Sequence, residues 1–162
     1  MSPLKTLADT DLRALSATAA ALPRLRKNLN LHPALEDPVQ RLFNALAPGT
    51  YVRPHRHADW ELMLALRGAF SILIFDDAGR VAERIELCAT QGTLALEIPA
   101  QTWHAAVVMV PETVMFEVKP GPYRAVAEQD CAAWAPAEGV AAAGLLEQWY
   151  RTAQAGEQAP AW

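Results

Sequence analysis

The apolar and polar positions follow a helical period at the two ends of the chain. From Leu7 to Leu22, apolar side chains recur at helical spacing in an alanine-rich segment, which predicts a helix that Pro23 ends. A second amphipathic pattern predicts a helix from Val140 to Thr152. The side chains expected on the buried face of this second helix are Val140, Leu145, Leu146 and Trp149.

Between these ends, the period changes to short apolar runs separated by turn residues. The expected strands are Gln40–Leu46, Thr50–Arg53, Trp60–Ala65, Ala69–Phe75, Val81–Leu87, Thr93–Ile98, Trp103–Val108 and Thr113–Val118. The separators are rich in Pro, Gly and Asp, and the run Asp76-Asp77-Ala78-Gly79 is typical of a hairpin turn. Many short strands at this spacing favour a mainly β sandwich or barrel over a parallel sheet with intervening helices.

The length of 162 residues fits one domain. Within it we expect three parts: an N-terminal helix and an irregular or extended arm over residues 1–39, a β-barrel core over residues 40–120, and a C-terminal loop and helix over residues 121–162. There are no internal repeats.

Charge and composition exclude several classes of protein. The chain has 14 Lys and Arg against 18 Asp and Glu, a net charge of −4, which argues against a nucleic-acid partner. No apolar stretch is long enough to cross a membrane, and the N-terminus lacks the pattern of a secretion signal. We therefore expect a cytoplasmic protein, in which Cys88 and Cys131 are free thiols.

Three of the four histidines fall inside the predicted β region. His55 and His57 stand two apart, so on an extended segment both imidazoles point to the same side. Glu61 can join them only if the chain turns between His57 and Glu61, and closure of the sheet can bring His104 to the same point. Three imidazoles and a carboxylate suit one divalent transition metal per chain (Fe, Mn, Ni, Co or Zn) and leave coordination positions open.

The spacing of these residues resembles the first motif of the cupin superfamily. Gly49, five residues, His55 and His57, three residues, Glu61, six residues and Gly68 match every fixed position of that motif. In cupins the two histidines and the glutamate of this motif are metal ligands. The resemblance therefore implies a cupin β-barrel, a double-stranded β-helix or jelly-roll barrel, whose metal is held at these positions.

The second cupin motif is present with three departures. It consists here of Gly92, Pro99, Gln101 and His104. The spacer before Pro99 is one residue longer than usual, Gln101 replaces a glycine, and Val108 stands where asparagine is usual. His104 keeps its distance from the proline, and the resemblance implies that it is the fourth ligand.

A wider resemblance extends from Leu22 to Gly139. The segments that carry it are RLRKNLNLHP, DPVQR, PGTYVRPHRH, FDDAG, EIPAQTWH, FEVKPGPY and WAPAEG. They are similar, in the same order, to the WbuC family of cupin-fold metalloproteins, whose members are associated with polysaccharide (O-antigen) gene clusters. The resemblance implies a metal-binding cupin and a link to polysaccharide biosynthesis, but no particular reaction.

A second set of polar residues is a candidate for substrate contact. Its members are Arg24, Arg26, Asn28 and Asn30 in the basic arm, with Tyr51 and Arg53, which share the parity of the two motif histidines. Arginine suits phosphate or carboxylate because its donors form a fork. The alternatives are a solvated connecting segment for the arm and a structural role for Tyr51 and Arg53.

Three hypotheses for function follow. The first is a metal-dependent enzyme, an isomerase or epimerase, acting on a small polar molecule such as a sugar or sugar nucleotide. The second is an Fe(II)-dependent dioxygenase-type cupin, and the third is a non-catalytic cupin that binds a metal or a sugar. An acid or base beside the metal would favour an enzyme, and the candidates are Glu97, Glu117 and Tyr51. We also expect a homodimer, because the edges of such a barrel need covering.

Overall fold

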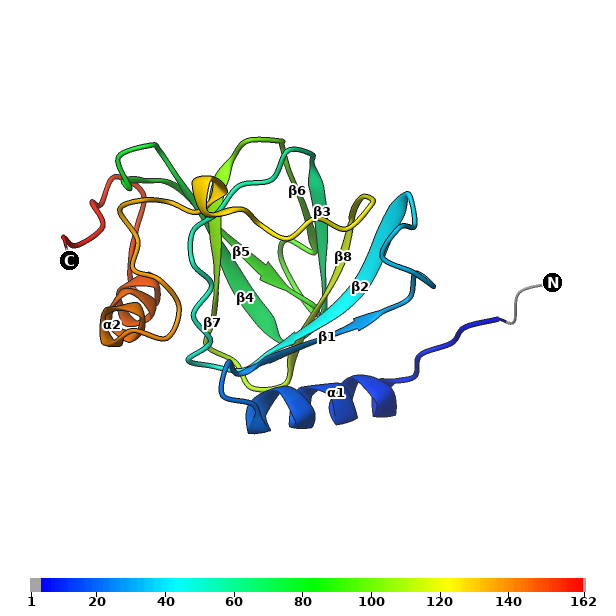
Figure 1. Ribbon diagram of the computed structural model, residues 1–162. Coiled ribbons are helices and arrows are strands. Elements are labelled where there is room, and N and C mark those ends of the chain that lie inside the picture. Colours follow the sequence, from blue (N-terminus) through cyan, green and yellow to red (C-terminus); the bar gives the residue numbers. More distant parts are fainter. Residues whose placement is uncertain (1–3, 162) are drawn as a thin grey trace.

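The structure is a computed structural model that describes residues 4–161. Within these residues two antiparallel sheets face each other and form a barrel, with one helix near each end of the chain (Figure 1). The larger sheet has the strand order β1 (Arg26–Asn30), β2 (Val39–Leu46), β8 (Thr113–Pro120), β3 (Glu61–Arg67) and β6 (Ala95–Ile98). The smaller sheet has the order β5 (Val81–Cys88), β4 (Ala69–Phe75) and β7 (Trp103–Val108). The mainly β fold predicted from the sequence is confirmed.

The two helices cover opposite outer faces of the barrel. Helix α1 (Asp9–Ala21) lies along the larger sheet, and helix α2 (Ala141–Tyr150) lies beside β7 of the smaller one (Figure 1). A short 3₁₀ turn, η1 (Glu128–Asp130), lies in the long loop between β8 and α2. No helix within residues 4–161 is long and apolar enough to cross a membrane.

One predicted strand is wrong. Thr50–Arg53 is extended but belongs to neither sheet. Its polar groups bond elsewhere: the Thr50 hydroxyl donates to the carbonyl of Arg24 at 2.8 Å, and the carbonyl of Tyr51 accepts from the guanidinium of Arg26. The arm instead supplies β1, which pairs with β2 and extends the larger sheet.

The smaller sheet is covered on both faces, which explains its nearly continuous apolar strands. On β7, Ala106 and Val108 pack with the residues between the sheets, whereas Ala105 and Val107 pack with α2. On β4, Ile72 belongs to the first group and Leu73 to the second. Because successive side chains of a strand point to opposite faces, a strand buried on both sides has few polar positions.

Alternation on β8 sorts its residues between helix and barrel interior. Val114 and Phe116 pack against α1, with Ala19 of the helix fully buried between them and β2. Met115, Glu117 and Lys119 have the opposite parity and line a cavity inside the barrel. Two charged side chains on the inner face of a β strand are unusual in a structural core, and they indicate a polar site.

The buried face of α2 differs from the predicted one. Leu146 is fully buried together with Tyr150, whereas Leu145 is 56% exposed and Val140 is half exposed. Neighbouring residues on a helix are separated by about 100°, so Leu145 and Leu146 cannot both face the sheet. The small Ala143, one turn before Leu146, completes the packed face and was not recognised in the sequence.

The last glycine of the first motif allows a close approach between two strand ends. Gly68 has φ = 67°, and a Cβ atom there would lie 2.4 Å from the Thr113 hydroxyl oxygen. Only glycine satisfies both conditions without strain. Gly68 therefore allows the tight connection between β3 and β4.

Candidate metal centre

The backbone around His55 and His104 brings two imidazoles together. The two residues form an isolated antiparallel bridge, with N–H to carbonyl distances of 3.0 and 2.9 Å. The Nδ1 atom of His55 lies 2.8 Å from the carbonyl oxygen of Arg53, and that of His104 lies 2.9 Å from the carbonyl of Thr102. Since a carbonyl only accepts, both Nδ1 atoms carry the proton, and both Nε2 atoms present a lone pair.

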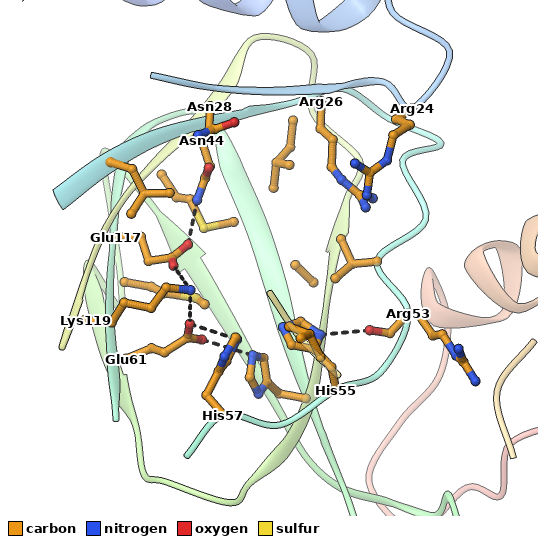
Figure 2. Close-up of a pocket in the computed structure, with 18 of the residues that line it drawn as sticks. Arg24, Arg26, Asn28, Asn44, Arg53, His55, His57, Glu61, Glu117 and Lys119 are labelled. Atoms are coloured by element: carbon orange, nitrogen blue, oxygen red, sulfur yellow. Dashed lines mark hydrogen bonds and ion pairs between the residues drawn. The ribbon is translucent and has the colours of Figure 1, made fainter. Parts of the chain in front are cut away.

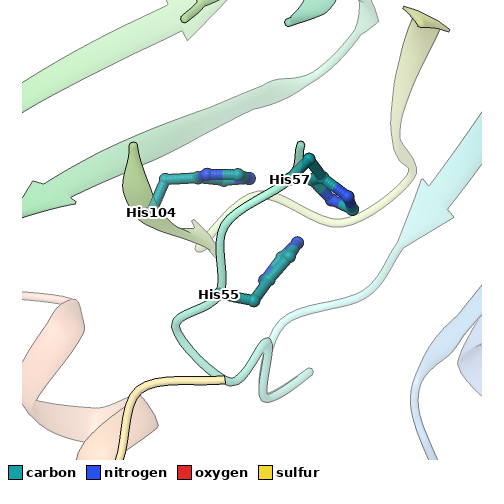
Figure 3. A group of neighbouring side chains, drawn as sticks. All are labelled: His55, His57 and His104. Carbon is teal, nitrogen blue, oxygen red and sulfur yellow. The ribbon is translucent and has the colours of Figure 1, made fainter. Parts of the chain in front are cut away.

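His57 completes a group of three. One ring nitrogen from each of His55, His57 and His104 lies within 4.8 Å of the other two (Figure 3). The backbone of His57 is held by Gln101, whose N–H donates to the His57 carbonyl at 2.8 Å. The convergence expected from the spacing of the motif residues is therefore present, although His55 and His57 lie in an irregular extended segment rather than in a regular strand.

Gln101 explains how the second motif tolerates its missing glycine. Its φ of 61° lies in the left-handed region that glycine normally occupies. Its side-chain amide also donates to the His57 carbonyl at 3.2 Å. The turn before β7 thus keeps its geometry, and Gln101 adds a contact to the segment that carries two of the histidines.

Glu61 lies against the imidazoles as the first residue of β3. Its two carboxylate oxygens are 3.0 Å from His57 Nε2 and 3.2 Å from His104 Nε2, and its side chain is only 2% exposed. The chain turns between His57 and Glu61, as the sequence requires. Glu61 is not part of the group whose ligand atoms all lie within 4.8 Å of one another. Its role as fourth ligand therefore stays a prediction.

Two buried atoms of this site face each other without a proton between them. Glu61 Oε2 and His104 Nε2 are both buried and make no hydrogen bond within the described residues. The proton of His104 is held at Nδ1, so a carboxylate oxygen and an imidazole lone pair oppose each other. Such a pair is repulsive unless a cation lies at the site, and the residues present fit a metal ion.

Burial keeps His55 and His57 in the neutral form that a metal requires. Desolvation, together with the neighbouring imidazoles, lowers the pKa of His55 to about 3. Desolvation likewise lowers the pKa of His57 to about 4, although Glu61 opposes the shift. For Glu61, burial raises the pKa, but the Lys119 ammonium beside it opposes this and holds the pKa below its ordinary value. Neutral imidazoles beside an ionised carboxylate form a donor set ready for a divalent cation.

A chain of polar contacts leads from Glu61 to the far wall. Lys119 Nζ lies 2.6 Å from a Glu61 oxygen and 2.7 Å from a Glu117 oxygen, and the Asn44 amide donates to Glu117 at 2.6 Å (Figure 2). Burial raises the pKa of Glu117 despite the nearby ammonium. Burial lowers the pKa of Lys119, but Glu117 and Glu61 outweigh it, so the pKa lies above its ordinary value. Lys119 is therefore a cation with two acidic partners.

These groups share one cavity of about 660 Å³. The three histidines, Glu61, Lys119 and Glu117 line it together with apolar side chains that include Met63, Ile72 and Met115. Its volume lies within the range of small-molecule sites, about 300–1,000 Å³. The arginines Arg24 and Arg26 reach into the cavity from the arm (Figure 2).

The predicted substrate contacts divide into two groups. Arg24, Arg26, Asn28 and Arg53 line the cavity. The Arg53 guanidinium pairs with Glu128 at 2.9 Å and points away from the histidines, whereas its carbonyl orients His55 (Figure 2).

Two of the predicted substrate contacts do not reach the cavity. Asn30 accepts a hydrogen bond from Asn28 at 2.8 Å and is exposed on the edge strand. Tyr51 is buried against α2, where its hydroxyl donates to the Pro136 carbonyl at 2.8 Å. The parity argument for Tyr51 failed because the segment lacks the regular alternation of a strand.

The candidates for an acid or base are reduced to one. Glu117 lines the cavity, Glu97 is exposed on β6, and Tyr51 lies in the core. The expected strand Thr113–Val118 ends one residue before Lys119, and the sequence did not reveal Lys119, Asn44 or Glu138 as cavity residues. The period-two pattern of Met115, Glu117 and Lys119 was the signal that could have placed Lys119 inside.

Comparison with known families gives a match over residues 7–87, half of the chain. The profile is that of a family described as a domain of unknown function, DUF6016. The chain belongs to this family. No curated protein matches this DUF6016 chain. The WbuC resemblance is not confirmed by the DUF6016 match.

Solved structures similar to this DUF6016 protein include a cupin. A cupin superfamily protein from Desulfitobacterium hafniense is 21% identical with a TM-score of 0.50, over 74% of this chain and 98% of that one. A conserved protein of unknown function from Streptococcus pyogenes is 15% identical with a TM-score of 0.50, over 76% and 93% of the two chains. Oxalate oxidase in complex with glycolate is 18% identical with a TM-score of 0.52, over 67% of this chain and 57% of that one, less than two thirds of its length. These likenesses establish a cupin β-barrel fold.

Proposed function

We propose that this DUF6016 protein is a metal-dependent enzyme acting on a small polar substrate. The observation that carries the proposal is the position of the Lys119–Glu117 pair, which lies beside the three histidines in one cavity. His55, His57 and His104 would hold the metal, with Glu61 as the fourth ligand. A bound divalent metal would polarise a substrate oxygen as a Lewis acid.

The chain's own residues support proton transfer at a substrate carbon or hydroxyl. Glu117 faces the cavity and is fixed by Asn44 on one side and Lys119 on the other. Lys119 also contacts Glu61, so it links the carboxylate beside the histidines to the proposed acid or base. A carboxyl group held beside a Lewis acid suits isomerisation or epimerisation. This proposal favours an enzyme over a non-catalytic binding protein.

The resemblance to the WbuC family supports a sugar or sugar nucleotide as substrate. A role in polysaccharide (O-antigen) biosynthesis follows from that resemblance alone and is part of the proposal. Asn28, Asn44 and the arginines of the arm offer the donors that hydroxyl and phosphate groups accept.

An Fe(II)-dependent oxygenase is the second candidate. The apolar side chains of Met63, Ile72 and Met115 line the same cavity as the three histidines, and an apolar wall of this kind would suit dioxygen. In that case the iron-loaded protein would consume oxygen with substrate, which an oxygen electrode measures. Substrate conversion without oxygen consumption would exclude this candidate.

The metal assignment is tested by elemental analysis. Purified wild-type protein should contain about one transition metal per chain, and His57→Ala should lose it while keeping the far-ultraviolet circular dichroism of the folded barrel. Arg56→Ala is the matched control, because Arg56 lies between the two histidines in sequence but stacks on Trp103 outside the cavity. A wild type that cannot be loaded, or a His57→Ala variant with full occupancy, would show that the assignment is wrong.

The enzymatic proposal is tested with Glu117→Gln. We expect this variant to keep its metal and to lose at least ~100-fold in turnover of a sugar or sugar-nucleotide panel followed by proton NMR. A wild type that binds a panel member and never converts it would favour the binding protein instead.

A further inference from the structure

Two arginines of the arm converge on a single carboxylate at the cavity wall. Arg24 Nη2 lies 2.8 Å from Glu138 Oε2, and Arg26 Nη2 contacts the other oxygen, Oε1. Arg24 and Arg26 thus hold one anionic group between two guanidinium forks, and all three residues line the cavity that contains the histidines. Figure 2 shows both arginine side chains directed into this cavity.

Of the two arginines, Arg26 is the one that the surrounding protein holds in place. The Arg26 side chain is 22% exposed, and its second terminal nitrogen donates to the backbone carbonyl of Tyr51. Burial lowers the pKa of Arg26, and Glu138 opposes that shift, so the guanidinium needs an anionic partner. Lys27 lies in the same cavity wall, which leaves the wall with more positive than negative charge.

Glu138 is a partly exposed loop residue. It lies in the loop between β8 and α2, and its side chain is 38% exposed. Because this side chain is partly in solvent, its carboxylate can exchange the arginines for water.

We propose that Arg24 and Arg26 form the subsite for a phosphate group of the substrate, and that Glu138 occupies this subsite until the phosphate displaces it. The proposal rests on the proposed function, because it names the chemical class of the substrate for the same cavity: a phosphorylated or nucleotide-linked molecule.

The charge of phosphate distinguishes it from a carboxylate ligand. Glu138 is attached to the chain, so its carboxylate competes at an effective concentration of about a millimolar or more. A free monocarboxylate offers the arginines nothing that Glu138 lacks, and it must also give up its translational freedom. A phosphate carries more than one negative charge and three acceptor oxygens, so it can engage both forks and exchange with Glu138.

The test is phosphate binding by metal-free protein, measured by calorimetry at constant ionic strength. Inorganic phosphate is the probe, and acetate is the comparison. We expect Glu138→Gln to bind phosphate about tenfold more tightly than wild type, because the competing charge is gone. Arg24→Gln should bind it about tenfold more weakly, through loss of charge-assisted hydrogen bonds.

Asp130→Asn is the matched control. Asp130 belongs to the same loop and pairs with Arg56 at 3.3 Å, and neither residue lines the cavity. This variant loosens the loop without vacating the arginines, so its phosphate affinity should equal that of the wild type. Equal tightening by Asp130→Asn and Glu138→Gln would overturn the proposal, as would an unchanged affinity in Glu138→Gln or Arg24→Gln, or acetate binding as tight as phosphate.

Measurements on metal-free protein distinguish a failure of the phosphate subsite from a failure of the proposed metal-dependent function. If phosphate binds only to metal-loaded protein, the metal holds it and the arginine subsite is refuted. If metal-free protein binds phosphate as expected but no metal can be loaded, the subsite stands and the proposed metal-dependent function fails.

Discussion

At the scale of single residues, the chemistry of the site depends on where protons reside. His55 and His104 donate their Nδ1 protons to the carbonyls of Arg53 and Thr102. The Nε2 atoms of both histidines are therefore free to bind a cation. Glu61 supplies the negative charge, and it is buried among these nitrogens. The same burial makes protonation of the histidines unfavourable. It should therefore lower the stability of the metal-free protein at low pH.

This cost predicts a pH dependence for the stability of the metal-free protein. The pKa values of His55 and His57 are lowered to about 3 and about 4 in the folded chain, whereas histidine in an unfolded chain has a pKa of about 6.5. Below about pH 6.5 the unfolded chain binds protons that the folded chain does not. The free energy of unfolding should therefore fall as the pH drops, by up to about 1.4 kcal/mol per pH unit for each histidine.

Urea denaturation between pH 7 and pH 5 measures this slope before most carboxylates titrate. His55→Gln removes one of the two groups and should reduce the slope. An identical slope in wild type and His55→Gln would mean that His55 does not hold its lowered pKa in the folded protein.

At the scale of elements, each strand divides its residues between two environments. On β8, Val114 and Phe116 pack against α1, whereas Glu117 and Lys119 face the cavity. The alternation that stabilises the barrel is therefore also what delivers charged groups to the site. Helix α2 has no such second role, because its buried face only covers the smaller sheet.

Two adjacent leucines of α2 test this packing. Leu146 is fully buried and Leu145 is 56% exposed. Leu146→Ala should lower the free energy of unfolding by about 2–5 kcal/mol, since it removes buried methyl groups and leaves a cavity. Leu145→Ala should change it by less than about 0.5 kcal/mol. Urea unfolding of both variants makes the comparison, and similar losses would show that the helix packs by a different face.

At the scale of the whole molecule, the metal would join three separate parts of the chain. The segment with His55 and His57, the start of β3 with Glu61, and β7 with His104 meet only in the folded barrel. A ligand that binds the folded chain alone stabilises it by mass action, by about 4 kcal/mol when free metal exceeds its Kd a thousandfold.

Chelation should therefore lower the melting temperature of the loaded wild type by several degrees, measured by scanning calorimetry. His57→Ala should melt at the same temperature with and without chelator. A chelator-sensitive His57→Ala variant, or an insensitive wild type that holds metal, would contradict the link between the site and the fold. The homodimer stays a prediction, and light scattering would measure the mass in solution.

The sequence by itself determined most of the fold and the proposed ligands. Period-two and helical patterns predicted β4 and β7 with their observed bounds and most other strands to within a few residues, because these patterns report local burial. The spacing of His55, His57 and His104 indicated their convergence, because the motif encodes a turn and a return strand. The sequence showed that Gln101 departs from the motif. It did not reveal that Gln101 would adopt the backbone conformation of the missing glycine.

Only the tertiary structure decided which polar residues share the cavity. Tyr51 lies outside it, because Thr50–Arg53 pairs with no strand and its side chains bond to the arm and to the loop between β8 and α2. Lys119 and Asn44 lie in the cavity together because β2 and β8 are neighbours in the larger sheet. Glu138 reaches Arg26 across 112 positions of sequence. Local patterns specify which side of a strand is buried, whereas contacts between distant segments depend on how the sheets close.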